Sequence, residues 1–112
     1  MFKPMVIKTS IERIKECNGN LDPAIQEAWY VNFNRASQYT HVVVTFRGCR
    51  DIKAIYKIEE WEHGWKNRYI FKGYRDIFME NKLLGKELNP ILFKQGRRNP
   101  VAYMEENELL AS

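Results

Sequence analysis

Two neighbouring β-rich segments, separated by a short glycine-containing turn, constrain most strongly what this chain can fold into. His41 to Arg47 is rich in β-branched residues and ends at Gly48, which is typical of a central strand. Residues 52–61 then place apolar side chains at alternate positions, as expected for a strand with one buried face. The turn over residues 48–51 has a composition typical of hairpins. The sequence therefore predicts an antiparallel hairpin at the centre of the fold.

Helix signals lie mainly before this hairpin. Thr9 and Glu12 match a capping box, in which a hydroxyl and a carboxylate accept hydrogen bonds from each other's backbone amides. Asp22 followed by Pro23 indicates a second helix start. Further helical segments are predicted near residues 34–37 and over residues 76–82.

The other strands are predicted to be short and to be joined mostly by tight turns. They cover residues 4–8, 68–72 (closed by Gly73), 91–94 and 101–104. Short strands with few residues for long crossovers favour an antiparallel sheet that curls into a small barrel. The predicted fold class is therefore α+β, with short N-terminal helices and a small, partly closed antiparallel β-barrel.

Length and composition favour one domain. At 112 residues the chain suffices for a single core; we expect residues 1–104 to form it and residues 105–112 to be a frayed acidic tail. No apolar run reaches the roughly 18 residues of a membrane span, and no secretory signal is evident. Cys17 and Cys49 lack C-x-x-C spacing. We therefore expect a cytoplasmic protein with reduced thiols and no membrane partner.

Positive charge is concentrated in one part of the sequence. The formal net charge is +4, yet residues 66–100 hold nine Lys or Arg against three Asp or Glu, which is a local charge of +6. Such a segment can attract phosphate groups. A solvated face of a small protein is the alternative explanation of the same charge.

Signatures of catalysis are missing from the sequence. The two histidines, His41 and His63, have no companion at metal-ligand spacing, and no Gly-rich phosphate loop or nucleophile elbow occurs. We predict no catalytic residue, no metal site and no cofactor. An enzyme would need a hidden acid–base pair, such as His63 with Glu60 or Glu62.

Binding chemistry is better represented. Trp61 is expected in the core, whereas Trp65 lies between Gly64 and Lys66 and can be either a core residue or a stacking platform for a base. Arg97 and Arg98 follow Gly96 in a predicted turn, where their guanidinium groups can bind phosphate or remain solvated. The predicted nucleic-acid-binding residues are Arg47, Trp65, Arg68, Lys72, Lys86, Arg97 and Arg98.

Four segments in a fixed order resemble a known type of domain: "YTHVVVTFRGCRDIKAIYKIEEW", "RYIFKG", "LLGKEL" and "GRRNPVAY". They are similar to a small β-rich domain that accompanies GIY-YIG-type endonuclease modules in bacterial and phage proteins. The similarity runs from about Trp29 to Tyr103. The nuclease module itself has no counterpart here, because the GIY and YIG strands are absent. The residues that match the motifs are Arg68, Gly73, Gly85, Lys86, Gly96, Asn99 and Pro100.

The resemblance implies a PUA-like barrel that holds nucleic acid. An SH3-like barrel is the alternative form of the predicted fold. Fold alone does not determine function. We expect a non-catalytic nucleic-acid-binding module, with DNA or RNA, single or double strands and the oligomeric state left open. The alternative is a protein-interaction module, for example a phage or accessory protein that binds a host enzyme.

Overall fold

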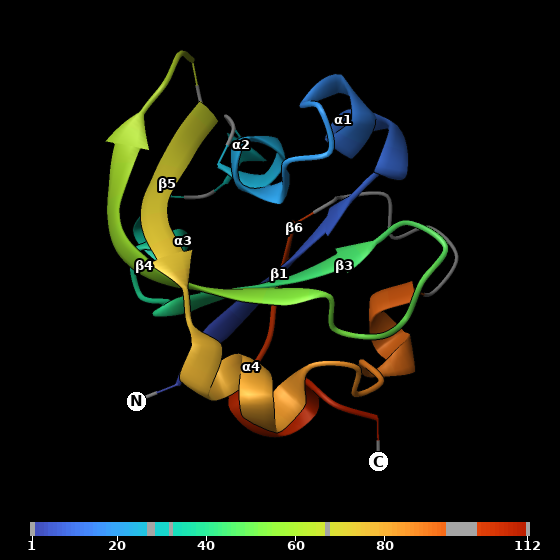
Figure 1. Ribbon diagram of the computed structural model, residues 1–112. Helices are drawn as coiled ribbons and strands as arrows, with labels where there is room; N and C mark the ends of the chain where they lie inside the picture. The colour runs from blue at the N-terminus through green and yellow to red at the C-terminus, as the bar shows by residue number, and fades with distance from the viewer. Residues whose placement is uncertain (1, 27–28, 32, 67, 94–100, 112) are drawn as a thin grey trace.

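The chain folds around one twisted β-sheet with helices on both faces (Figure 1). The computed structural model describes residues 2–26, 29–31, 33–66, 68–93 and 101–111. The strands are β1 (Pro4–Thr9), β2 (Trp29–Tyr30), β3 (His41–Phe46), β4 (Ala54–His63), β5 (Arg68–Arg75) and β6 (Val101–Tyr103). The helices are α1 (Ile11–Glu16), α2 (Leu21–Ile25), α3 (Phe33–Ala36) and α4 (Ile77–Leu83), with 3-10 turns η1 (Pro90–Phe93) and η2 (Glu106–Glu108).

The sheet is mixed rather than antiparallel. Its strand order is β2-β5-β4-β3-β1-β6. β1 pairs in parallel with β3, in a register that runs from Pro4 opposite His41 to Thr9 opposite Phe46, whereas the other pairs are antiparallel. The α+β prediction is confirmed, but the prediction of a wholly antiparallel sheet was wrong. A parallel pair needs a long crossover, and the segment from residue 10 to residue 40, with its short helices, supplies it.

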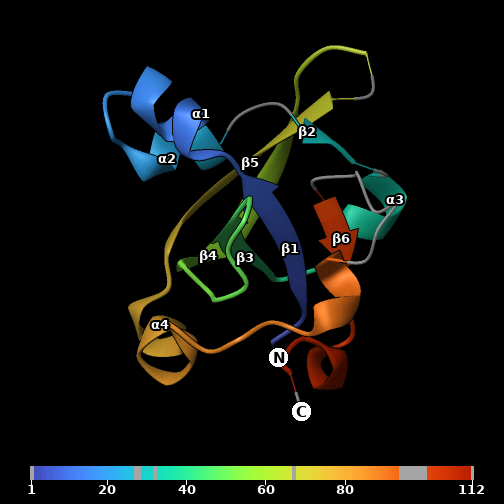
Figure 2. The same cartoon turned by 90° about the vertical axis from the view of Figure 1, so that its right-hand side faces the viewer.

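The predicted barrel does not close. β2 pairs only with β5 and β6 only with β1 among the described strands, so the two edge strands do not meet. α3 occupies the space beside them (Figure 2). Phe33 stacks on Tyr69 of β5 at 4.9 Å between ring centroids, and the Arg35 guanidinium lies 4.5 Å from the ring of Tyr103 in β6. Side chains of α3 thus fill the gap that strand pairing would close in a barrel.

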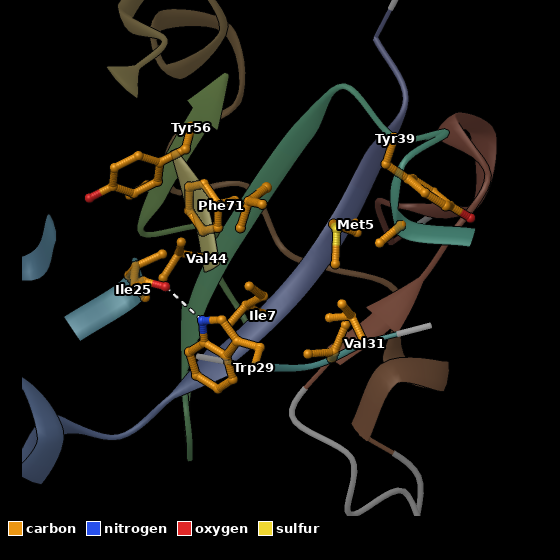
Figure 3. Packing of buried hydrophobic residues seen from close by; sticks show 13 residues of the cluster. Met5, Ile7, Ile25, Trp29, Val31, Tyr39, Val44, Tyr56 and Phe71 are labelled. Carbon is orange, nitrogen blue, oxygen red and sulfur yellow. Dashed lines mark hydrogen bonds between the residues drawn. The ribbon is translucent and has the colours of Figure 1, made fainter. Parts of the chain in front are cut away.

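Each face of the sheet carries its own hydrophobic cluster. Met5, Ile7 and Val44 face one side, where they pack with α2, β2 and residues of the β4–β5 hairpin (Figure 3). Val6 and Val43 face the other side, where they pack with Leu92 of η1 and with residues that follow β6. β3 is buried along most of its length, which confirms the predicted central strand.

The β4–β5 hairpin is longer and more irregular than predicted. The predicted partner strand ended before Gly73, whereas β5 continues through it to Arg75. The register shifts between Ile58 and Glu60, which indicates a β-bulge. A Cβ atom at Gly73 would lie 2.0 Å from the Lys57 carbonyl oxygen. Glycine is therefore required here by the close approach of the neighbouring strand, and it does not end the strand.

Two predicted helix starts are displaced. Thr9 is the last residue of β1, and Ser10 caps α1 by accepting a hydrogen bond from the Arg13 backbone amide at 3.1 Å. Asn20 is the N-cap of α2, and the Asp22 carboxylate instead accepts a hydrogen bond from the hydroxyl of Tyr56. The strand pairing and the tertiary hydrogen bond outweigh the local capping preference in both cases.

The segment after α4 also differs from the prediction. Residues 91–94 were expected to form a strand, but η1 spans Pro90–Phe93. The Asn89 side chain accepts a hydrogen bond from the Ile91 amide at 3.0 Å, and this local bond favours a turn over an extended strand. α4 itself confirms the predicted helix, with Asp76 as its N-cap.

The acidic tail is attached to the fold rather than frayed. Leu109 is fully buried in the second cluster, and its carbonyl accepts a hydrogen bond from the Asn89 amide at 2.8 Å. Leu110 forms a β-bridge with Leu88. Two apolar residues at the end of the segment therefore outweigh its three glutamates, which remain exposed to solvent.

We expect Gly73→Ala to destabilise the protein by about 1–3 kcal/mol, because backbone atoms must move apart to admit the new methyl group. Chemical denaturation of the variant and the wild type measures this change. Gly85→Ala is not a suitable control because Gly85 has a positive φ of 82°, so Tyr74→Ala, at the exposed neighbouring position, serves instead. Equal stability of Gly73→Ala and wild type would contradict the steric argument.

Candidate nucleic-acid interface

Trp65 lies at the tip of the β4–β5 hairpin and is 56% exposed. The Gly64 amide donates to the Arg68 carbonyl at 2.9 Å, and the Arg68 amide donates to the Trp65 carbonyl at 3.0 Å. Lys66 has a left-handed backbone with φ of 54°, and its carbonyl accepts a 2.7 Å hydrogen bond from His63 Nε2. The turn is thus held by its own hydrogen bonds while it presents a large ring to solvent.

Two positively charged side chains lie within 6 Å of the Trp65 ring centroid. The Arg68 guanidinium is 5.0 Å from the ring centroid and Lys66 Nζ is 5.8 Å from it. Such distances are typical of cation–π contacts. The structure therefore brings together Trp65 and Arg68, which were predicted as binding residues, and adds Lys66 to them.

Lys72 and Lys86 do not join this group. Lys72 Nζ pairs with Glu62 at 3.2 Å, with both side chains exposed, so part of its charge is neutralised. Lys86 is exposed in the turn after α4, and Figure 1 shows α4 at the opposite end of the molecule from the tip of the β4–β5 hairpin. Arg97 and Arg98 lie outside the residues that the structure describes, so their predicted role stays a prediction.

Arg47 lies at a different place, directly after β3. Its backbone amide donates to the Thr9 carbonyl at 2.8 Å, which continues the parallel pairing of β1 and β3. Its exposed side chain lines a surface pocket of about 320 Å³. The described lining of this pocket consists of Lys8, Thr9, Ser10, Arg13, Trp29 and Arg47.

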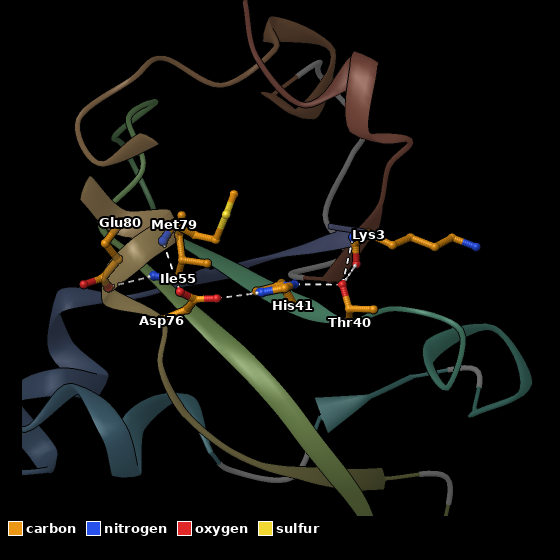
Figure 4. A network of polar contacts seen from close by, with 7 residues as sticks. All are labelled: Lys3, Thr40, His41, Ile55, Asp76, Met79 and Glu80. Atoms are coloured by element: carbon orange, nitrogen blue, oxygen red, sulfur yellow. Dashed lines mark hydrogen bonds and ion pairs between the residues drawn. The ribbon is translucent and has the colours of Figure 1, made fainter. Parts of the chain in front are cut away.

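A partly buried chain of polar contacts joins Lys3, β3 and the N-cap of α4 (Figure 4). His41 Nε2 lies 2.9 Å from Asp76 Oδ2, and His41 Nδ1 lies 2.7 Å from the Thr40 hydroxyl oxygen. The same hydroxyl oxygen accepts a 2.8 Å hydrogen bond from the Lys3 amide. Although this order of groups resembles a hydroxyl–imidazole–carboxylate relay, the imidazole is buried and the hydroxyl oxygen is held by backbone. We interpret the chain as a structural connection.

The acid–base pair considered from the sequence does not form. His63 Nε2 donates to the Lys66 carbonyl, and Glu62 is paired with Lys72. Another glutamate, Glu80, is buried in α4, where it accepts hydrogen bonds from the Ile55 amide at 2.9 Å and from Arg75 Nε. These contacts satisfy a buried charge. In the described part of the chain, no group of three or more His, Cys, Asp or Glu is placed to hold a metal ion.

Sequence reasoning missed five of the six described residues that line the pocket. They are Lys8, Thr9, Ser10, Arg13 and Trp29. Thr9 was assigned only to a capping box, and none of the five was predicted to bind a ligand. Lys8, Thr9 and Ser10 lie near Arg47 because β1 and β3 are parallel, so that the ends of both strands lie at the same edge of the sheet. A correct prediction of this parallel pairing would have placed the end of β1 beside Arg47.

Comparison with known protein families, curated proteins and solved structures finds no match to this chain. In the part that the structure describes, no helix is long and apolar enough to cross a membrane.

Stability is expected to depend on the protonation of His41. Burial lowers the pKa of His41 below its usual 6.5, and the hydrogen bond to Asp76 opposes this effect only in part. The unfolded chain therefore binds a proton at a pH where the folded protein does not, so the free energy of unfolding decreases as the pH falls below about 7. Although desolvation raises the pKa of Asp76, hydrogen bonds from Met79 and His41 lower it overall, so the Asp76 contribution is lost only below about pH 4.

Thermal unfolding followed by circular dichroism between about pH 8 and pH 5 measures this dependence. We expect a smaller decrease in midpoint for His41→Asn, which removes the titrating group. His63→Asn is the matched control, because the exposed His63 makes its hydrogen bond within the turn. Equal pH dependence of His41→Asn and wild type would contradict the prediction.

Proposed function

We propose that this protein is a non-catalytic nucleic-acid-binding module. The observation that carries the proposal is the exposed indole of Trp65 with two cations within 6 Å of its ring. Aromatic rings stack on bases, and each stacked base contributes about 1–3 kcal/mol. Lysine and arginine beside the ring neutralise the phosphates on either side of that base. The turn thus combines both kinds of contact that a single nucleotide offers.

The shape of the hairpin favours binding to an unpaired base. Trp65 stands at the tip of two long antiparallel strands and not in the interior, so a base must leave its own stack to contact the ring face. The hydrogen bonds within the turn restrict its backbone before any ligand binds, which lowers the entropic cost of binding. We propose single-stranded DNA or RNA as the preferred ligand on these grounds.

One sequence-based inference supports the same proposal. The motif order resembles the small domain that accompanies GIY-YIG-type endonucleases, for which a role in holding nucleic acid is implied, and we keep this kinship as a proposal. We also propose a cytoplasmic location, because Cys17 and Cys49 are both free thiols, as is usual in reducing compartments.

We expect Trp65→Ala to weaken binding to a fluorescein-labelled single-stranded oligonucleotide by about 1–3 kcal/mol, because one stacking contact is lost. Fluorescence anisotropy at low salt measures the affinity. Lys66→Ala is expected to reduce the slope of log affinity against log salt by about one, because one phosphate contact is removed.

Phe78→Ala is a matched control for these variants. Phe78 is also an exposed aromatic residue with a cation beside it, since Lys82 Nζ lies 4.2 Å from its ring centroid. It belongs to α4, away from the hairpin tip. Its substitution is expected to leave the affinity unchanged. If the wild-type protein bound no DNA or RNA at low salt, the proposal would be rejected.

A second candidate function is protein interaction, as for an accessory protein that binds a host enzyme. The observation that favours it is a group of exposed apolar side chains around the end of β5 and α4. They are Tyr74, Ile77, Phe78 and Leu84. Several large apolar side chains exposed within one short segment are a feature that protein-binding sites share.

The two functions differ in what the tagged full-length chain retains from a lysate after nuclease treatment. A protein-interaction module is expected to retain one partner protein, and Phe78→Ala, combined with Ile77→Ala, should release it because two apolar anchors are removed. Trp65→Ala is the control, and it is expected to leave the partner protein bound. Loss of every partner on nuclease treatment would contradict this function.

A further inference from the structure

The pocket beside Arg47 has a chemical character of its own. None of the described residues that line it is acidic, and three of them are Lys or Arg. Lys8 contributes least to its charge, because its ammonium group donates to the Leu92 carbonyl at 2.7 Å. Arg13 is ion-paired with Glu16 at 2.9 Å, so part of its charge is neutralised, as for Lys72. Arg47 forms no ion pair with any described acidic residue.

The hydroxyl groups of the pocket are also available as donors. Thr9 is only 2% exposed, and its buried Oγ1 has no hydrogen-bond partner among the described residues. Buried polar atoms in native proteins are nearly always hydrogen-bonded, so an exception calls for an explanation. Ser10 Oγ accepts a hydrogen bond from the Arg13 amide, which leaves its own proton for another acceptor. The pocket lining thus combines guanidinium groups with hydroxyl groups, of which that of Thr9 is buried.

Trp29 adds an apolar wall to this set. It is almost fully buried, and its single polar atom, Nε1, already donates to the Ile25 carbonyl at 2.6 Å (Figure 3). A volume of about 320 Å³ is near the lower limit for small-molecule pockets. Donors on one side and an aromatic wall on the other suit an oxyanion that is attached to an organic group.

We propose that this pocket is a phosphate-binding subsite. It holds a phosphate group of the same nucleic-acid strand whose base stacks on Trp65. The identity of the ligand rests on the proposed nucleic-acid function, whereas the preference for phosphate rests on the donors alone. β2 connects the two places, because Trp29 of the pocket pairs with Tyr69, the residue after Arg68. In this proposal, a nucleic-acid strand that contacts both Trp65 and Arg47 passes over β2.

The test compares Arg47→Ala and Thr9→Val with the wild-type full chain. Arg47→Ala is expected to weaken oligonucleotide binding about tenfold, because a charged hydrogen bond to phosphate is lost. Thr9→Val is expected to weaken it about threefold without lowering the thermal midpoint, because the hydroxyl makes no hydrogen bond to any described residue. Arg50→Ala, with the same change of charge outside the pocket lining, should change the affinity less than about twofold.

NMR separates the pocket from the hairpin tip. Inorganic phosphate, titrated into the ¹⁵N-labelled protein at constant ionic strength against chloride, is expected to shift the amide signals of Thr9, Ser10 and Arg47. Arg47→Ala should abolish these shifts. A 5′-phosphorylated oligonucleotide and its unphosphorylated counterpart then show whether the pocket holds a terminal phosphate or an internal one.

The outcomes distinguish the two proposals. If oligonucleotides bind and Trp65→Ala weakens them, but Arg47→Ala and Thr9→Val do not, the subsite is rejected and the proposed function stands. If no oligonucleotide binds but phosphate shifts the pocket signals, the proposed function is rejected and the phosphate site stands. If phosphate moves no pocket signal and neither pocket variant weakens oligonucleotide binding, the subsite is rejected.

Discussion

The parallel pairing of β1 with β3 is the constraint on which the rest of the structure depends. It places two buried strands in the interior of the sheet, so that alternate side chains feed a hydrophobic cluster on each face. It also obliges the chain between them to cross over the sheet, which places α1, α2 and α3 on one side. At the start of the pair, hydrogen bonds of Thr40 and His41 connect β3 to Lys3 and to Asp76, the N-cap of α4.

The same pairing explains why the local elements could be predicted and the barrel could not. Alternation and β-branched residues predict β3 and β4, and Asp76 predicts the start of α4, because these signals act between neighbours in sequence. Parallel register depends on contacts between residues nearly forty positions apart. The composition of either strand does not indicate which strand it will pair with. The bulge near Ile58 and the burial of Leu109 likewise depend on distant partners.

The candidate site divides in the same way. Trp65 and Arg68 are close in sequence, so a turn between two strands was enough to predict that they lie together. Arg47 was predicted from its charge, but its neighbours Thr9, Ser10 and Arg13 come from the end of β1 and the start of α1. Lys72 shows the limit of counting charge along the sequence, because pairing across the hairpin places it against Glu62.

The two candidate contact points are Trp65 and the pocket beside Arg47, and they are exposed for different structural reasons. Trp65 is exposed because the hairpin extends beyond the helices that cover its base. The pocket is open because β1 and β3 end together, and only the short α1 follows there. Between them, β2 is only two residues long, so the sheet edge offers few backbone groups for pairing with another strand. A ligand that contacts both points must therefore be held mainly by side chains, through charge and stacking, which are the contacts that nucleic acids offer.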